Sequence, residues 1–128
     1  MVERRFINAD AAPAPVGGYS QAIEISGARR VVYVSGQIPT AKDGTVPNSF
    51  SEQARLVWRN IEAQLQAADM SLENLVKVTT FLSDRKFADE NGAIRREVLR
   101  EHAPALTVLI AGIFDPAWLL EIEAIAAE

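Results

Sequence analysis

Two glutamates near the end of the chain have the side chains best suited to acid-base chemistry. Glu121 and Glu123 alternate with Leu120, Ile122 and Ala124, and residues two apart in a β-strand point to the same face. A carboxylate partly enclosed by apolar groups can exchange a proton with an attacking water. Both glutamates are therefore candidates, although an exposed or ion-paired position is an equal alternative for Glu123.

Few other residue types that support catalysis are present. The chain has no cysteine and a single histidine, His102, which excludes disulfides, thiolate nucleophiles and iron-sulfur clusters. A site with several histidine ligands is impossible, and a Ser-His-Asp triad would have to use His102. We expect no metal site, and we expect His102 to end a helix rather than to act in catalysis.

Asn91 interrupts an otherwise apolar helical stripe. It follows Phe87 by four residues and precedes Ile94 and Val98 by three and seven, so all four side chains share one face of a helix. A polar group on such a face needs a partner. Its amide therefore either points into a ligand cleft or satisfies nearby backbone groups.

Two further candidates lie beside turns and strand ends. Tyr19 follows Gly17 and Gly18, where it either closes over a ligand or packs against the protein. Gly36 follows a run of β-branched residues, and its missing Cβ would let the backbone approach a ligand closely. A simple bulge or turn is the alternative for Gly36.

The pattern of apolar residues predicts the elements that position these side chains. Ser49 and Glu52 have the spacing of a capping box, and apolar residues recur at helical intervals after them. A hairpin turn is expected at residues 26–28. The predicted order is strands 21–25 and 30–35, a helix from 49, strand 75–82, helix 86–102, and strands 105–113 and 119–126, with a short strand at Phe6 and Ile7.

This order predicts an α+β fold in a single domain over residues 1–128, with one mixed sheet and both helices on one face. The other face of the sheet would then be uncovered. Residues 105–113 are apolar on both sides of the pleat, which is typical of a strand buried on both faces. We therefore predict an obligate oligomer in which subunits cover the open face.

Charge and hydropathy limit the partners. No apolar run reaches the length of a membrane span, and the opening residues lack the apolar stretch of a secretory signal, so we expect a cytoplasmic protein without a membrane partner. The net charge of -4 opposes nucleic-acid binding unless the arginine pairs at 4–5, 29–30 and 95–96 converge. We interpret those pairs as solvated surface charge.

Several short motifs together resemble one family from end to end. They are Gly18-Tyr19-Ser20-Gln21-Ala22, Val34-Ser35-Gly36-Gln37-Ile38-Pro39, Asn60, Phe87 with Asn91, Pro104-Ala105 and Glu121-Ile122-Glu123-Ala124-Ile125-Ala126. In this order they are similar to the Rid (reactive-intermediate deaminase, YjgF-type) family, also known as the endoribonuclease L-PSP family. The resemblance implies a chorismate-mutase-like fold and a homotrimer whose sheets form a barrel, with a small-molecule cleft at each subunit interface.

The resemblance also implies an activity, which is hydrolysis of reactive enamines or imines to a carbonyl compound and ammonia without cofactor or metal. Glu121 would shuttle the proton, and Tyr19, Gly36 and Asn91 would line the cleft. The stretch Leu106-Thr107-Val108 would supply backbone groups, with the carbonyl at Val108 helping to hold the water.

One residue departs from the family pattern. Active members carry an arginine after the Pro-Ala pair, where it grips the substrate carboxylate, and this chain has Leu106 there. We hypothesise that the ligand has no carboxylate at that point, or has an apolar group there. The alternatives are that another residue has taken over the arginine's role or that the cleft is vestigial.

Three functions follow, in order of preference. The first is an enamine or imine deaminase with altered specificity. The second is a trimer that binds or senses a small molecule without turnover. The third is a ribonuclease, which net acidity and a single histidine disfavour.

Overall fold

The first helix begins at the predicted cap and packs its apolar side into the core. The structure is a computed structural model that describes residues 2–128; Met1, the first residue of the expected domain, lies outside the described residues. Helix α1 spans Phe50–Ala67, and the Ser49 side chain accepts a hydrogen bond from the Glu52 amide at 3.2 Å. The predicted helix start is therefore confirmed, and its apolar stripe, including Val57, Ile61 and Leu65, is buried in the core.

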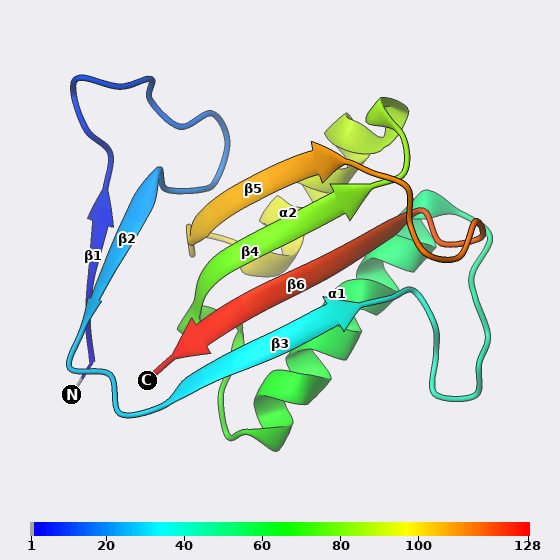
Figure 1. Cartoon of the computed structure of the whole chain (residues 1–128), viewed down its shortest axis with the longest axis horizontal. Coiled ribbons are helices and arrows are strands. Elements are labelled where there is room, and N and C mark those ends of the chain that lie inside the picture. Colours follow the sequence, from blue (N-terminus) through cyan, green and yellow to red (C-terminus); the bar gives the residue numbers. More distant parts are fainter. Residues whose placement is uncertain (1) are drawn as a thin grey trace.

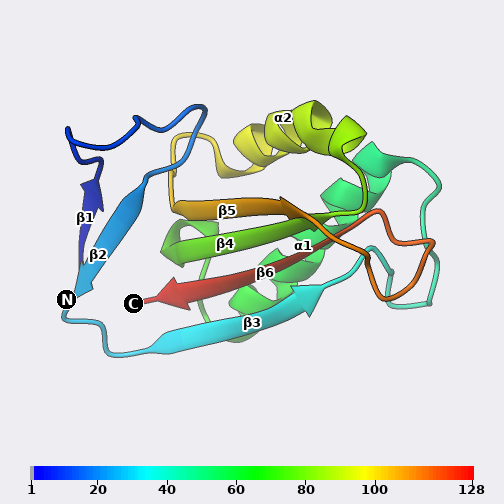
Figure 2. The ribbon, with the colours of Figure 1, turned by 45° about the horizontal axis from the view of Figure 1, so that its top comes forward.

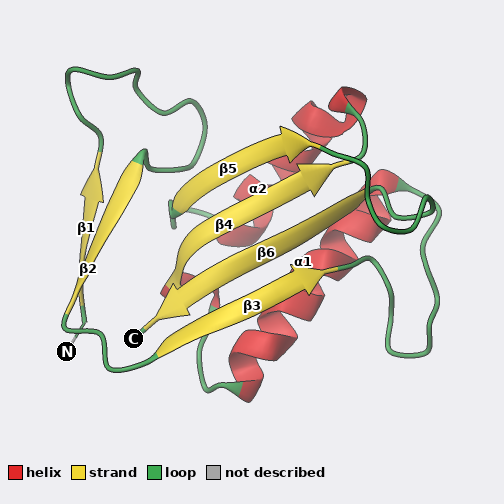
Figure 3. Ribbon diagram, in the orientation of Figure 1, coloured by secondary structure: helices red, strands yellow, loops and turns green. Residues whose placement is uncertain are grey.

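A four-stranded mixed sheet lies against α1 and against a second helix, α2 (Ala88–Leu99). Its strands are β3 (Val31–Gln37), β6 (Leu120–Ala127), β4 (Leu75–Leu82) and β5 (Ala105–Ile110), in that spatial order. The β4 and β5 strands are parallel and the other neighbours are antiparallel. Both helices cover the same face, as Figures 2 and 3 show. The predicted α+β class, with a mixed sheet and helices on one face, is confirmed.

The N-terminal strands form a separate two-stranded ribbon, which stands apart from the main sheet in Figure 1. Strand β1 (Glu3–Ile7) pairs antiparallel with β2 (Ala22–Ser26). The hairpin predicted at residues 26–28 is therefore wrong. The physical reason for this difference is a pairing between distant parts of the chain. The amides of Arg29 and Arg30, just before β3, donate hydrogen bonds to the Glu128 carbonyl at 2.7 and 2.9 Å.

Helix α2 is shorter than predicted. A 3-10 turn at Arg85–Phe87 precedes it, capped by the Asp84 side chain, and Arg100 ends it with a φ of 56°. His102 thus lies beyond the helix, and the expectation that it ends the helix is wrong. Its Nε2 instead donates to the Leu75 carbonyl oxygen at 2.7 Å.

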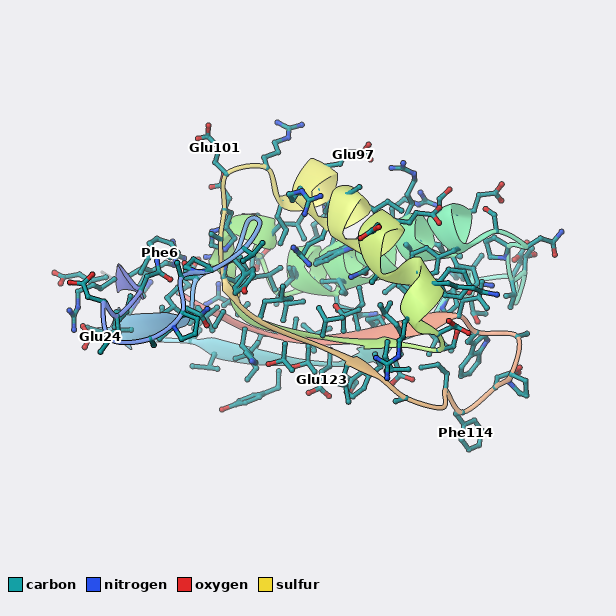
Figure 4. The ribbon with its side chains drawn as sticks, turned by 90° about the horizontal axis from the view of Figure 1, so that it is seen from above. Phe6, Glu24, Glu97, Glu101, Phe114 and Glu123 are labelled. Atoms are coloured by element: carbon teal, nitrogen blue, oxygen red, sulfur yellow. The ribbon has the colours of Figure 1, made fainter. Side chains whose placement is uncertain are left out.

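The face of the sheet turned away from the helices carries exposed side chains; we call it the open face. Tyr33 on β3 is 76% exposed, and Glu123 projects on the side opposite the helices in Figure 4. Strand β5 is an edge strand, and its Val108, Leu109 and Ile110 are each about 40% exposed. Within one chain this strand is therefore not buried on both faces as its sequence predicts.

Among the helices in residues 2–128, none is long and apolar enough to cross a membrane.

Candidate functional site

A pocket between α2 and the edge strand β5 brings together four of the predicted site residues. Tyr19, Asn91, Leu106 and Val108 all line it, and its volume is about 420 Å³. We call it the α2 pocket. Arg95 and Arg96 of α2, neither of which was predicted as a site residue, line it too.

Strand register explains which β5 side chains reach the α2 pocket. Leu106 and Val108 pair with Val78 and Thr80 of β4, which are buried under the helices. Since paired residues point to the same face of a sheet, Leu106 and Val108 point toward the helices. Thr107 between them points to the open face, where its Oγ1 accepts a hydrogen bond from Lys77 Nζ at 2.7 Å.

Tyr19 reaches the α2 pocket because the loop before it is fastened to the start of β5. The amide of Ser20 donates to the Pro104 carbonyl at 3.2 Å, and Ser20 forms an isolated parallel bridge with Ala105. Gly17 and Gly18 have φ values of 90° and 73°, a backbone region that favours glycine. The turn that carries Tyr19 therefore depends on these two glycines.

Asn91 enters the pocket from the buried side of α2. It is only 3% exposed, and it lies one turn before Arg95 on the same helix. It is buried, as both of its predicted roles require. Asn91 also lines the α2 pocket, and contact of its amide with a ligand stays a prediction.

Glu121 and Gly36 lie next to each other at a different place, on the main sheet between β6 and β3. A Cβ at position 36 would lie 2.8 Å from the Glu121 Cδ and 3.1 Å from its Cγ, and closer still to a carboxylate oxygen. The φ of Gly36 is not in the left-handed region, so glycine is needed here for space. Glu121 is half-buried, whereas Glu123 is exposed.

Two amide side chains of α1 hold the loops around this carboxylate. Gln53 is buried, its Nε2 donates to the Pro47 and Ala117 carbonyls at 2.9 and 3.0 Å, and its Oε1 accepts from the Leu119 amide at 2.8 Å. Asn60 Nδ2 donates to the carbonyls of Ile38 and Thr40. The ends of β3 and β6 beside Gly36 and Glu121 are thus fixed from one helix.

The seven predicted site residues consequently fall into two groups. Glu121 pairs with Phe81 and lies on the open face, as Thr107 does, with Gly36 beside it. Tyr19, Asn91, Leu106 and Val108 surround the α2 pocket on the helix side. Within one chain the sheet separates the Glu121 carboxylate from the α2 pocket.

Arg95 corrects the interpretation of the arginine pairs as solvated charge. Its side chain is buried, with 6% exposed, and its Nη2 donates to the Gly17 carbonyl at 2.8 Å. Burial lowers the pKa of Arg95 most, the positive charge of Arg96 lowers it further, and Tyr19 acts in the opposite direction. The charge of Arg95 suggests a surface position, and no signal in the sequence marks this arginine as buried.

Within residues 2–128, no three His, Cys, Asp or Glu side chains lie close enough together to hold a metal ion.

The sheet, the two helices on one face and the α2 pocket define an α+β protein of the Rid type. The chain belongs to the family described as Endoribonuclease L-PSP, whose sequence model matches residues 9–128. The resemblance noted in the sequence is therefore confirmed, and Leu106 marks this chain as a divergent member.

Relatives of known sequence match most of the chain. A RutC family protein of Pyrococcus horikoshii is 36% identical over 125 residues, covering 96% of this chain and 97% of its own. The 2-iminobutanoate/2-iminopropanoate deaminase of Rattus norvegicus is 32% identical over 127 residues, covering 98% of this chain and 90% of its own.

Solved structures agree on the fold. Yeast Mmf1 is 35% identical with a TM-score of 0.74 and covers 98% of this chain and 99% of its own. A Rid-family protein of unknown function from Yersinia pestis has a TM-score of 0.86 with 98% of both chains covered, and at 23% identity it supports the fold alone.

Proposed function

We propose that this protein hydrolyses a reactive enamine or imine to a carbonyl compound and ammonia, in a cleft between the subunits of a homotrimer. Membership of the family and the deaminase among the relatives support the reaction class. The observation that carries the proposal is the Glu121 carboxylate, held half-buried over Gly36 at the ends of two strands. No cofactor is needed for this chemistry.

The proposed reaction runs in two steps. A water attacks the carbon of the protonated C=N bond while one of its protons passes to the Glu121 carboxylate, which gives a neutral carbinolamine. The protonated Glu121 then gives this proton to the amine nitrogen. The C–N bond breaks, ammonia leaves, and the Glu121 carboxylate takes the hydroxyl proton as the carbonyl forms. Glu121 thus acts first as base and then as acid, while backbone groups near Gly36 and Val108 orient the water.

A second copy of the chain is part of the proposal. Because the sheet separates Glu121 from the α2 pocket in one chain, the complete site would combine the pocket of one protomer with the carboxylate of its neighbour. Exposed apolar residues on β5 and Tyr33 on the open face support such an association. Light scattering should give a trimer, and a well-folded monomer at micromolar concentration would contradict it.

Turnover is tested by measuring ammonia release from freshly generated imines, with Glu121→Gln as the inactive comparison. Equal release by both proteins would contradict the role of Glu121. Binding of a small molecule without any release would instead favour the second function, a binding or sensing trimer, which the loss of the family arginine at Leu106 supports. A ribonuclease is disfavoured by the net charge of -4, and absence of RNA binding at every salt concentration would dispose of it.

We also propose that Leu106 alters specificity by presenting an apolar surface where relatives present a guanidinium. Separately, we propose that the protein is located in the cytoplasm, which cell fractionation would test.

A further inference from the structure

A buried arginine joins helix α2 to the loop that carries Tyr19. Arg95 is 6% exposed, and its Nη2 donates a hydrogen bond to the Gly17 carbonyl at 2.8 Å. Arg95 and Tyr19 both line the α2 pocket, and Tyr19 lies two residues after the carbonyl that Arg95 binds. The position of the Tyr19 side chain is therefore tied to the hydrogen bond from Arg95.

The next arginine of α2 packs against the same turn. A Cβ at Gly17 would lie 3.2 Å from Arg96 Nη1, and one at Gly18 would lie 3.1 Å from its Cγ. Both distances are shorter than ordinary van der Waals contact. The absence of side chains at these two residues thus lets the turn lie directly on Arg96, within reach of the Arg95 donor.

The segment just before Tyr19 has few other attachments. Val16 is 84% exposed. Within residues 2–128, residues 14–18 form one hydrogen bond with another element, and it is the bond from Arg95. The next fixed point along the chain is the Ser20 amide, which donates to the Pro104 carbonyl at 3.2 Å. Without Arg95, the turn would be held only by packing.

The surroundings of Arg95 indicate that it does little for the stability of the core. Its Nε is buried with no hydrogen-bond partner among residues 2–128, and it forms no salt bridge in that part of the chain. Burying a charge without a partner is unfavourable. An apolar side chain of similar length should therefore suit this position in the core, but it could not hold the turn.

We propose that Arg95 is a positioning residue, which keeps Tyr19 in the wall of the α2 pocket by binding the Gly17 carbonyl. Leu106 and Val108 line the same pocket from β5, so release of the turn would remove the Tyr19 wall that encloses a ligand with them. Affinity depends on such enclosure. The inference rests on the proposed function only for its effect on KM.

Limited digestion with chymotrypsin tests the hold on the turn. This protease cuts after Tyr19, and because Ser20 is 3% exposed, it reaches that bond only when the loop opens. Cutting then follows the open population. A charge-assisted hydrogen bond changes an equilibrium about tenfold or more, so Arg95→Met should be cut after Tyr19 about tenfold faster. Arg59→Met, at an exposed residue of α1 outside the α2 pocket, should be cut at the unaltered rate.

NMR tests the position of the Tyr19 ring. An aromatic ring shifts the signals of methyl groups beside it, so the methyl signals of Leu106 and Val108 report on Tyr19. Arg95→Met should move these signals toward their positions in Tyr19→Ala. Arg95→Lys, which keeps a charged donor, should leave them nearer to those of the unaltered protein. Methyl signals that stay in place in Arg95→Met would contradict the role of Arg95.

The ammonia assay adds a kinetic readout. Arg95→Met should raise KM about tenfold and change kcat less. In a Tyr19→Ala background Arg95→Met should add nothing, since residues that act through one another are not additive. A full effect of Arg95→Met in that background would overturn the inference.

The outcomes separate this inference from a structural role and from the proposed function. An unchanged rate of cutting after Tyr19 in Arg95→Met would overturn the inference. Failure of this variant to fold by circular dichroism, or a lower urea midpoint, would overturn it too, because Arg95 would then support the core. Faster cutting with shifted methyl signals would support the inference even if the unaltered protein releases no ammonia and the proposed deaminase activity fails.

Discussion

Substituting Gly36 with alanine tests the contact on which the proposed chemistry depends. The new Cβ would lie 2.8 Å from the Glu121 Cδ, whereas carbon atoms pack at about 3.5 Å or more. The carboxyl carbon would therefore have to move by at least about 0.7 Å, and the nearer carboxylate oxygen by more. Because a displacement of about 1 Å at a reacting group can reduce the rate about 100-fold, we expect kcat to fall between about 10-fold and 100-fold.

This loss corresponds to about 1.4 to 2.7 kcal/mol of transition-state stabilisation. The assay is ammonia release from freshly generated imine under saturating conditions. Gly112→Ala is the matched control, since a Cβ there meets nothing within 4 Å, and it should leave kcat unchanged. Stability of Gly36→Ala in urea should change little, because the overlap is with the mobile end of a side chain.

A double substitution sharpens the result. If Gly36→Ala acts only through the carboxylate, it should add nothing to the loss caused by Glu121→Gln, since interacting residues are not additive. An unchanged kcat in Gly36→Ala, or losses that multiply in the double variant, would refute the link between the two residues.

Three further predictions concern stability and titration. Gln53→Ala should lower the free energy of unfolding by about 3 kcal/mol, because each buried group left without its partner costs about 1 to 3 kcal/mol. Urea denaturation measures this loss, and the control Gln64→Ala, at an exposed residue of the same helix, should leave the free energy of unfolding unchanged. Ser49→Ala should cost about 1 kcal/mol through the lost helix cap, and an unchanged denaturation midpoint would contradict this. The hydrogen bond and the charge of Arg5 lower the pKa of Glu24, so the stabilisation from this pair is present above the unfolded pKa and is lost as pH falls through the folded value. An NMR titration should give a midpoint for Glu24 below its ordinary value, and Arg5→Gln should raise it.

Local patterns predicted the elements well, because their causes lie within a few residues. The Ser49 cap starts α1 where the capping pattern places it, and strand β4 has the limits that its β-branched residues indicate. The failures arise from long-range pairing. The bonds from Arg29 and Arg30 to Glu128 join the two ends of the chain, and the sequence around residues 26–28 contains no sign of them.

The sequence was enough to name candidate site residues, but not to predict how they are arranged around the sheet. The alternation in β6 places Glu121 on the open face, and the register of β5 places Leu106 on the helix side. Which side of the sheet carries the helices depends on packing over the whole chain. Arg95 was missed because arginines are rarely buried, and only the fold shows that the Gly17 loop covers it.

The outer edge of β5 has a consequence for the assembly of the homotrimer proposed above. Beyond the bridge at Ser20, no strand of residues 2–128 pairs with the backbone donors and acceptors along that edge, and Val108, Leu109 and Ile110 beside them are partly exposed. An unprotected apolar edge of this kind is a template for disordered sheet growth. In the proposed trimer, docking of newly folded protomers would compete with aggregation through this edge. Refolding at low protein concentration should therefore recover more native protein than refolding at high concentration.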